Sequence, residues 1–167
     1  HDKVGNFTDY LTKDDLLVFN NTKVIPCRLK AKSYQNISNN SALKIEVTLN
    51  KLESEKIWSS FCLPGRKVNV GDVLEFENDF SAKVVKISNG LYFLKFNIVY
   101  DDLMKSLEKI GEMPIPPYIQ KKRGFRKSDF ENYQTTFAEH NGSVAAPTAS
   151  LHFDKNLFKK IKKKKIP

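Results

Sequence analysis

One histidine and one short polar run carry the side chains of this 167-residue chain that are best suited to chemistry on a bound substrate. His152 lies in the stretch Ser-Leu-His-Phe, and its imidazole can act as a general acid or base because its ordinary pKa is near neutral. Asn20, Thr22 and Lys23 follow a short apolar run and offer hydrogen bonds and a positive charge. Ligands commonly bind at the carboxyl ends of buried strands, where we expect these residues. A polar turn and a histidine bonded to backbone are the commoner alternatives, and both stay open.

A basic run is the candidate for contacts with nucleic acid. Between residues 121 and 127, five positive charges surround one aromatic ring. Lysine and arginine neutralise phosphates and a phenylalanine ring can stack on an unpaired base, so the run predicts an RNA-binding loop. A solvated flexible loop is an equally good explanation. The residues are Lys121, Lys122, Arg123, Phe125, Arg126 and Lys127.

The formal net charge of +9 is concentrated at one end of the chain, where six lysines fall within the last nine residues. Those lysines fit the solvent-facing side of a helix, and the rest of the chain is only mildly basic. The composition therefore permits a nucleic-acid partner without requiring one. No apolar run approaches the roughly 20 residues that a membrane span needs.

Several enzyme and site classes are disfavoured because their motifs do not occur in the sequence. The patterns of P-loop NTPases, dinucleotide-binding folds, zinc proteases and serine hydrolases are missing. Cys27 and Cys62 form neither a disulfide framework nor a metal motif. They predict buried thiols in a reducing cytoplasm.

The middle of the chain predicts a small antiparallel barrel or sandwich. Alternating apolar and polar residues over 43–50 predict a strand with one solvated face, and further strands are expected at 57–63, 73–77, 82–87 and 91–94. The dipeptide Asn89-Gly90, between the last two strands, predicts a tight hairpin turn. These strands place an antiparallel β domain at about residues 31–100.

The flanking segments predict helices and one buried strand, as in an α/β domain. The continuous apolar run 16–19 predicts a strand buried on both faces. Helical spacing over 101–110 predicts a helix that Asp101 or Asp102 caps and Gly111 ends. Three prolines between 114 and 117 predict an extended connector, a short helix is expected over 130–137, and Asp154 can cap a last helix. We therefore expect an α/β domain that begins at 1–30, is interrupted at 31–100 and resumes through 101–167.

Three long motifs resemble those of one enzyme family. They are LVFNNTKVIPCRL at residues 17–29, GEMPIPPYI at 111–119, and YQTTFA at 133–138 followed by SVAAPTASLHF at 143–153. Their order and approximate spacing resemble the S-adenosylmethionine:tRNA ribosyltransferase-isomerases of queuosine biosynthesis. The resemblance implies an α/β domain, incomplete in this chain, that is interrupted by an inserted antiparallel β-barrel.

The resemblance also implies a reaction. Members of the family move the ribosyl part of S-adenosylmethionine onto a 7-aminomethyl-7-deazaguanine base in the anticodon of certain tRNAs and rearrange it, which gives epoxyqueuosine. Adenine and methionine leave. The implied enzyme is a cytoplasmic monomer with S-adenosylmethionine as substrate, tRNA as partner, no metal and no membrane contact.

Within the matched motifs, the chemistry of each side chain gives it a hypothetical role. His152 is the candidate for proton transfer. Asn20, Thr22 and Arg28 are suited to hold the sugar hydroxyls, and Lys23 adds a positive charge at the same place. The remaining candidates, which would shape the pocket, are Tyr133, Gln134 and Thr148.

The chain departs from the family pattern mainly in extent. The family has a segment before the position of His1 and a long C-terminal half, so we expect this chain to be the middle of the enzyme and inactive alone. Cys27 replaces a usual alanine and Ser150 a usual glycine. We expect the β domain to be stable and both flanks to be loosely ordered. The alternatives are a catalytically inactive RNA-binding module and a decayed gene product without activity.

Overall fold

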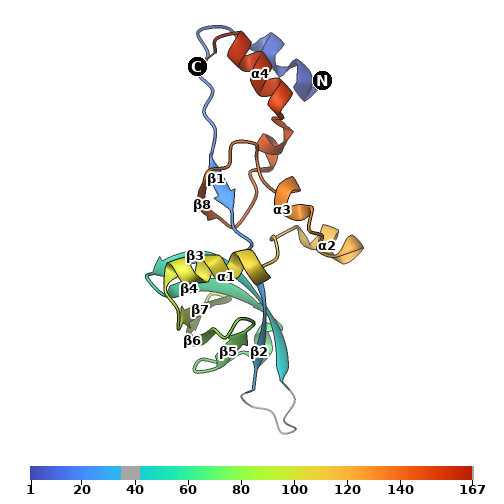
Figure 1. Ribbon diagram of the computed structural model, residues 1–167. Helices are drawn as coiled ribbons and strands as arrows, with labels where there is room; N and C mark the ends of the chain where they lie inside the picture. The colour runs from blue at the N-terminus through green and yellow to red at the C-terminus, as the bar shows by residue number, and fades with distance from the viewer. Residues whose placement is uncertain (35–41, 167) are drawn as a thin grey trace. The chain divides into compact units, whose positions relative to one another are not determined.

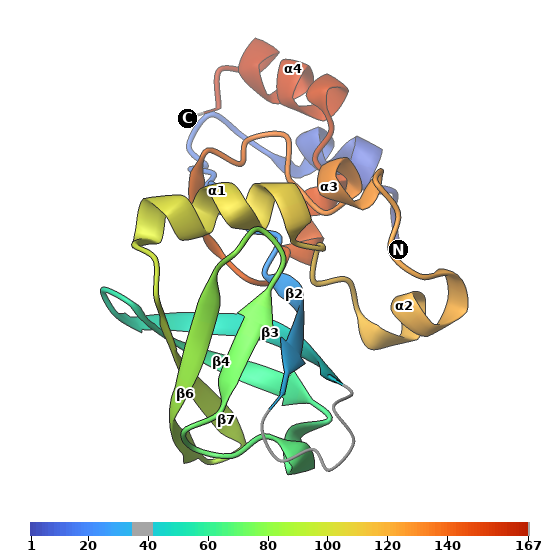
Figure 2. The same cartoon turned by 60° about the horizontal axis from the view of Figure 1, so that its bottom comes forward.

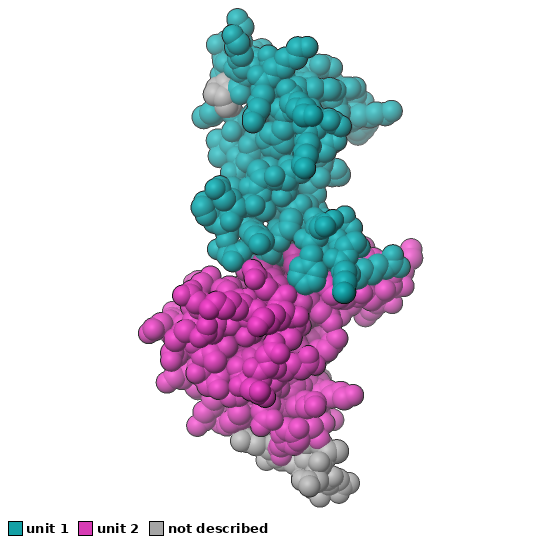
Figure 3. All heavy atoms as spheres, in the orientation of Figure 1, with its two compact units in different colours: residues 1–24, 126–167 teal, residues 25–125 magenta. Residues whose placement is uncertain are grey.

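The computed structural model describes residues 1–34 and 42–166, which form two compact units (Figures 1 and 3). Unit 2 is one continuous stretch, Ile25–Phe125. Unit 1 consists of the two segments on either side of it, His1–Val24 and Arg126–Pro167. The chain therefore leaves unit 1 once, builds unit 2, and returns.

Unit 2 contains a closed antiparallel barrel of six strands (Figures 1 and 2). The strands follow the order β2-β3-β4-β7-β6-β5 around the barrel, and every neighbouring pair is antiparallel. The barrel confirms the antiparallel β domain that the period-2 pattern predicts. The strands are β2 (Arg28–Ser33), β3 (Leu43–Ser54), β4 (Ile57–Leu63), β5 (Val73–Phe76), β6 (Ser81–Ser88) and β7 (Leu91–Phe96), with a short 3-10 helix at Gly65–Lys67.

The alternation of side chains explains why these residues close into a barrel. Ile45, Val47 and Leu49 of β3 point inward and are buried, while the residues between them face outward and keep contact with water. Asn89 and Gly90 adopt φ values of 51° and 77°, which confirms the predicted hairpin turn between β6 and β7. Local sequence therefore specifies both the inner face and the turn.

Helix α1 (Tyr100–Ile110) follows the last strand and buries Leu103 and Leu107. The helix is confirmed, and Gly111 ends it with an N–H bond to the Leu107 carbonyl of 2.8 Å. The predicted aspartate cap is wrong, because the N-cap residue is Val99 and both aspartates lie in the first turn. There their charges still favour the positive end of the helix dipole.

Unit 1 is built on a two-stranded parallel sheet, in which β1 (Thr22–Val24) pairs with β8 (His140–Ser143). A cluster of apolar side chains from both segments packs around Leu157 and Ile161 of α4 (Lys155–Lys163). Asp154 caps α4 by accepting a 2.7 Å bond from the Leu157 amide, as predicted. The other elements are α3 (Asp129–Asn132) and 3-10 helices at Val4–Tyr10 and Thr148–His152.

Two expectations for unit 1 are wrong. Residues 16–19 form no strand, and Leu16 and Val18 are 71% and 86% exposed. A strand needs a partner for its backbone hydrogen bonds, and in the described residues the β1–β8 ladder begins only at Thr22. The helix expected over 130–137 is shorter and begins one residue earlier, at Asp129–Asn132.

Candidate functional site

The polar run of the first motif lies at the amino end of β1. The Asn20 side-chain oxygen accepts bonds from the Thr22 amide, at 2.8 Å, and from the Thr22 hydroxyl. The carboxyl-end position inferred from sequence is therefore wrong, because the run precedes the strand instead of following one. Lys23 lies within β1 and is exposed. The Asn20 turn fixes the entry into β1 and leaves the outer faces of Asn20 and Lys23 open to solvent.

Gln134 is held tightly to β1. Its amide nitrogen donates to the Val24 carbonyl at 2.6 Å, and its amide oxygen accepts from the Val24 N–H at 2.9 Å. This bidentate pairing satisfies both backbone groups of Val24, as a neighbouring strand would. Gln134 therefore positions β1, and the adjacent Tyr133, half-buried, is the C-cap residue of α3.

His152 and Thr148 are the last and first residues of the second 3-10 helix of unit 1, and both are exposed. Phe153 follows His152 in the sequence, and Phe19 precedes Asn20. The ring centroids of Phe153 and Phe19 lie 5.1 Å apart. Both rings belong to an aromatic cluster with Phe137 and Phe158. Unit 1 therefore brings the segments of the first and third motifs together, although no bond joins His152 to the other candidate side chains among the described residues.

His140 is a residue that the sequence assigns to a loop and the structure places in β8. It stands opposite Thr22 in the parallel register, and its Nε2 lies 3.7 Å from a Glu139 carboxylate oxygen. The four residues of β8 carry no alternating pattern that would predict a strand. The parallel pairing therefore makes His140 a second histidine near the polar run.

Arg28 lies in unit 2 and has partners within the barrel unit. Its side chain is 8% exposed, its Nε lies 3.5 Å from Glu46 Oε1, and its Nη2 donates to the Ile115 carbonyl at 3.3 Å. The backbones of Arg28 and Glu112 also exchange two hydrogen bonds, of 3.1 and 2.8 Å. Arg28 thus fastens the segment after α1 to the start of β2.

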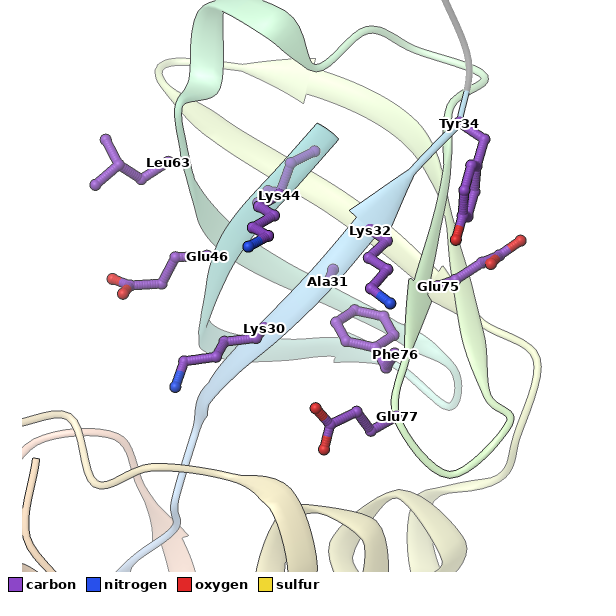
Figure 4. Close-up of a pocket in the computed structure, with 11 residues that line it drawn as sticks. Lys30, Ala31, Lys32, Tyr34, Lys44, Glu46, Leu63, Glu75, Phe76 and Glu77 are labelled. Carbon is purple, nitrogen blue, oxygen red and sulfur yellow. The ribbon is translucent and has the colours of Figure 1, made fainter. Parts of the chain in front are cut away.

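A pocket of about 600 Å³ opens on the barrel, over β2, β3 and β5 (Figure 4). In Figure 4, Lys32 lies beside Phe76, and the other charged residues of the lining are Lys30, Lys44, Glu46, Glu75 and Glu77. The charges of the lining balance, so the pocket favours no anion by itself. The lining combines outward-facing charged residues of these strands with the buried Ala31, Ile45 and Phe76. The sequence pattern alone does not predict this pocket, because it shows only strands with one solvated face. The full lining is Lys30, Ala31, Lys32, Tyr34, Lys44, Ile45, Glu46, Leu63, Glu75, Phe76 and Glu77.

Two polar contacts attach the following segment to this side of the barrel. Lys30 Nζ lies 2.5 Å from Glu112 Oε1, and the hydrogen bond to that carboxylate raises the pKa of Lys30. Gln120 Nε2 donates to Glu46 Oε2 at 3.4 Å. Together with Arg28, these contacts fix residues 112–120 on the outer surface of β2 and β3.

The predicted basic loop is in part a helix. Lys121, Lys122 and Arg123 form the last turn of α2 (Pro117–Arg123), which begins at a proline because proline fits the first helical position. Gly124, with φ of 68°, ends the helix, and Phe125 is half-buried. Arg126 and Lys127, both exposed, belong to unit 1. The basic run is therefore divided between the two units.

The two cysteines are buried thiols outside any disulfide, as predicted. Burial raises the pKa of Cys27 and of Cys62 to about 12, so neither thiol is a nucleophile at neutral pH. Within the described ranges, no three His, Cys, Asp or Glu side chains gather as a metal site requires. The helices of the same ranges include none long and apolar enough to cross a membrane.

Comparison with known proteins gives consistent matches. A family model described as "Queuosine biosynthesis protein" matches residues 1–167. The S-adenosylmethionine:tRNA ribosyltransferase-isomerase of Ruegeria sp. (strain TM1040) is 39% identical over 165 residues, which are 98% of this chain and 47% of the relative. The protein of the same name from Finegoldia magna is 43% identical over 166 residues, which are 98% of this chain and 45% of the relative.

The chain thus spans about half the length of the curated relatives it matches. Among solved structures, an S-adenosylmethionine tRNA ribosyltransferase from Thermotoga maritima is 28% identical. The match covers 97% of this chain and 41% of that one, with a TM-score of 0.40.

Proposed function

The chain belongs to the queuosine biosynthesis protein family, and on this premise we propose that it is part of an S-adenosylmethionine:tRNA ribosyltransferase-isomerase. The match of the family model along residues 1–167 is the observation that carries the proposal. The substrates would be S-adenosylmethionine, as ribosyl donor, and a tRNA with 7-aminomethyl-7-deazaguanine in its anticodon. The product would be epoxyqueuosine in the tRNA, made in the cytoplasm.

The finer architecture in this proposal is an incomplete α/β domain interrupted by the inserted barrel. Two observations support it. The segments of unit 1 lie on either side of unit 2 in the sequence, and the sheet of unit 1 has only β1 and β8 in the described residues. The exposed Leu16 and Val18 alternate with the half-buried Leu17 and Phe19 just before β1. Such an apolar extended segment is suited to pair with a further strand.

The reaction needs a base, an acid and groups that hold a sugar. A base removes a proton next to the sulfonium, whose positive charge acidifies that carbon, and the departing adenine accepts a proton or a hydrogen bond. His152 is our candidate for proton transfer. Asn20 and Thr22 are the candidates for the sugar hydroxyls, and Thr148 lies in the same 3-10 helix as His152.

Two of the candidate residues have backbone partners in the structure. Arg28 and Gln134 hold backbone segments in place, which supports positioning roles for them. His140 pairs in register with Thr22 and is the comparison residue for His152. Substitution of His152 by alanine should lower turnover much more than substitution of His140, and equal effects would remove His152 from its role.

Release of adenine tests the function. This chain and a chimera, in which it replaces the matching segment of the Finegoldia magna relative, are mixed with S-adenosylmethionine and the aminomethyl-deazaguanine tRNA. We expect free adenine with the chimera and with the parent enzyme, and none with the chain alone. A folded chimera that releases none, beside an active parent, would contradict the proposal and favour an RNA-binding module without catalysis. Binding of S-adenosylmethionine without tRNA then distinguishes the ribosyltransferase-isomerase, which should bind it, from an RNA-binding module, which should not.

A further inference from the structure

Helix α2 has one face bound to the barrel unit and one face open to solvent. Gln120 bonds to Glu46 of β3, and Ile119 on the same side is half-buried. Tyr118 is 73% exposed, and Lys121 and Lys122 are exposed three and four residues further on. Residues at these spacings share one face of a helix. An aromatic ring and two ammonium groups therefore lie together on the open face.

The open face carries positive charge only. The sequence of α2 contains no acidic residue, and its last turn is Lys121, Lys122 and Arg123. Neither Lys121 nor Lys122 forms an ion pair within the part of the chain that the structure describes. Basic residues in a last turn also favour the helix dipole, but that effect gives no reason for an exposed tyrosine beside them.

The helix is attached firmly enough to present this face in a defined orientation to the barrel unit. Glu46, which holds Gln120, is itself paired with the buried Arg28, and Arg28 bonds to the Ile115 carbonyl just before α2. Lys30 holds Glu112 at the start of the same segment. A ring on a short, anchored helix loses little conformational freedom when a ligand stacks on it.

We propose that the open face of α2 binds RNA, with Tyr118 stacking on an unpaired nucleotide and with Lys121 and Lys122 contacting the adjoining phosphates. The choice of RNA as the partner rests on the proposed function. The stacking role that the sequence suggests for Phe125 passes to Tyr118, because Phe125 is half-buried. A ring flanked by two cations fits a nucleotide of a single strand. The base offers a flat π face to the ring, and the phosphates offer negative charge to the lysines. An acidic protein segment would use the lysines without needing the ring.

Binding of two RNAs tests the proposal with the whole chain. The probes are an anticodon stem-loop RNA, which has unpaired bases, and a blunt duplex of the same stem. Loss of one base–aromatic stack weakens binding by about five- to 150-fold. We therefore expect Tyr118→Ala to weaken stem-loop binding by that factor and duplex binding little, and Tyr118→Phe to restore it. Lys121→Ala and Lys122→Ala should each weaken both RNAs and lower the salt slope by about 0.7–1.

Matched controls are Tyr10→Ala, at another exposed tyrosine, and Lys105→Ala, at an exposed lysine of α1. Neither should change RNA affinity. If the chain binds the stem-loop and Tyr118→Ala binds it equally well, this inference is wrong while the proposed function stands. If the wild-type chain binds neither RNA, the inference and its RNA partner both fail. Binding of poly-glutamate as tight as RNA, and insensitive to Tyr118→Ala, would assign the face to an acidic protein instead.

Discussion

Substitution of Gly111 by alanine should destabilise the barrel unit more than any other glycine-to-alanine change considered below. The backbone of Gly111 has φ of −73° and ψ of 149°, which every residue can adopt. The obstacle is space, because an added Cβ would lie 2.1 Å from the Pro26 carbonyl oxygen and 2.5 Å from that of Leu107. Both are backbone atoms, so neither can rotate away as a side chain would.

The expected loss in the free energy of unfolding has two sources, the steric overlap with Pro26 and the strain on neighbouring hydrogen bonds. Overpacking of this kind costs about 1–3 kcal/mol. Moving residues 111–112 away from Pro26 also strains the two backbone hydrogen bonds between Arg28 and Glu112, of 3.1 and 2.8 Å, worth about 1 kcal/mol each. We expect Gly111→Ala to lower the free energy of unfolding by about 3–5 kcal/mol. Urea unfolding followed by the fluorescence of Trp58, the single tryptophan and 6% exposed in the barrel, measures it.

Alanine substitutions at two other glycines separate the effect of steric overlap from the effect of backbone strain. Gly90 has φ of 77° and open space around it, so Gly90→Ala should cost only the conformational strain, about 1–2 kcal/mol. Gly142 has no positive φ and its nearest neighbour would lie at 3.9 Å, so Gly142→Ala should leave the Trp58 transition unchanged. A Gly111→Ala variant within about 0.5 kcal/mol of wild type would refute the close approach of residue 111 to Pro26.

Three further predictions use charges, thiols and a helix cap. Because burial raises the pKa of Cys27 and Cys62 to about 12, iodoacetamide at pH 8 should label them only in denaturant. Because the pKa of each thiol is higher in the folded than in the unfolded chain, its contribution to stability is complete below pH 9.0 and is lost as pH rises toward 12. The urea concentration at the midpoint of unfolding should therefore decrease as pH is raised above 9. The hydrogen bond to Glu112 raises the pKa of Lys30 above 10.5. The contribution of this pair to the free energy of unfolding is therefore present below pH 10.5 and is lost as pH rises above that value. Glu112→Gln should cost less than about 1 kcal/mol, and less still at high salt. Asp154→Ala should destabilise α4 by about 1 kcal/mol and speed hydrogen exchange of the Leu157 amide.

The barrel was predictable because its information is local. Alternation along residues 43–50 identifies the inner face of β3, and Asn89-Gly90 identifies a turn without reference to anything distant. The run 16–19 looks just as regular in the sequence. It forms no strand because backbone pairing depends on a partner far along the chain, and the partner β8 reaches only Thr22–Val24.

The grouping of the candidate site was beyond sequence reasoning for the same reason. The position of His140 opposite Thr22 depends on a parallel pairing between distant segments, and the four residues of β8 carry no strand pattern. The aromatic cluster that brings Phe19 to Phe153 likewise joins residues far apart in the sequence. The motifs identify the participating segments, and the fold decides which side chains meet.

The structure also gives a positioning role to residues of two of the motifs. The first motif supplies Pro26 and Arg28, and the second supplies Gly111 and Glu112. These four meet at one junction, where Gly111 approaches the Pro26 carbonyl and Arg28 pairs with the Glu112 backbone. A match to both motifs therefore reflects, in part, a junction that joins β2 to the end of α1. The burial of Arg28, its ion pair with Glu46 and its hydrogen bond to the Ile115 carbonyl fit a role in this junction. Loss of activity on changing Arg28 would implicate the substrate only if the barrel stayed as stable as in the wild type.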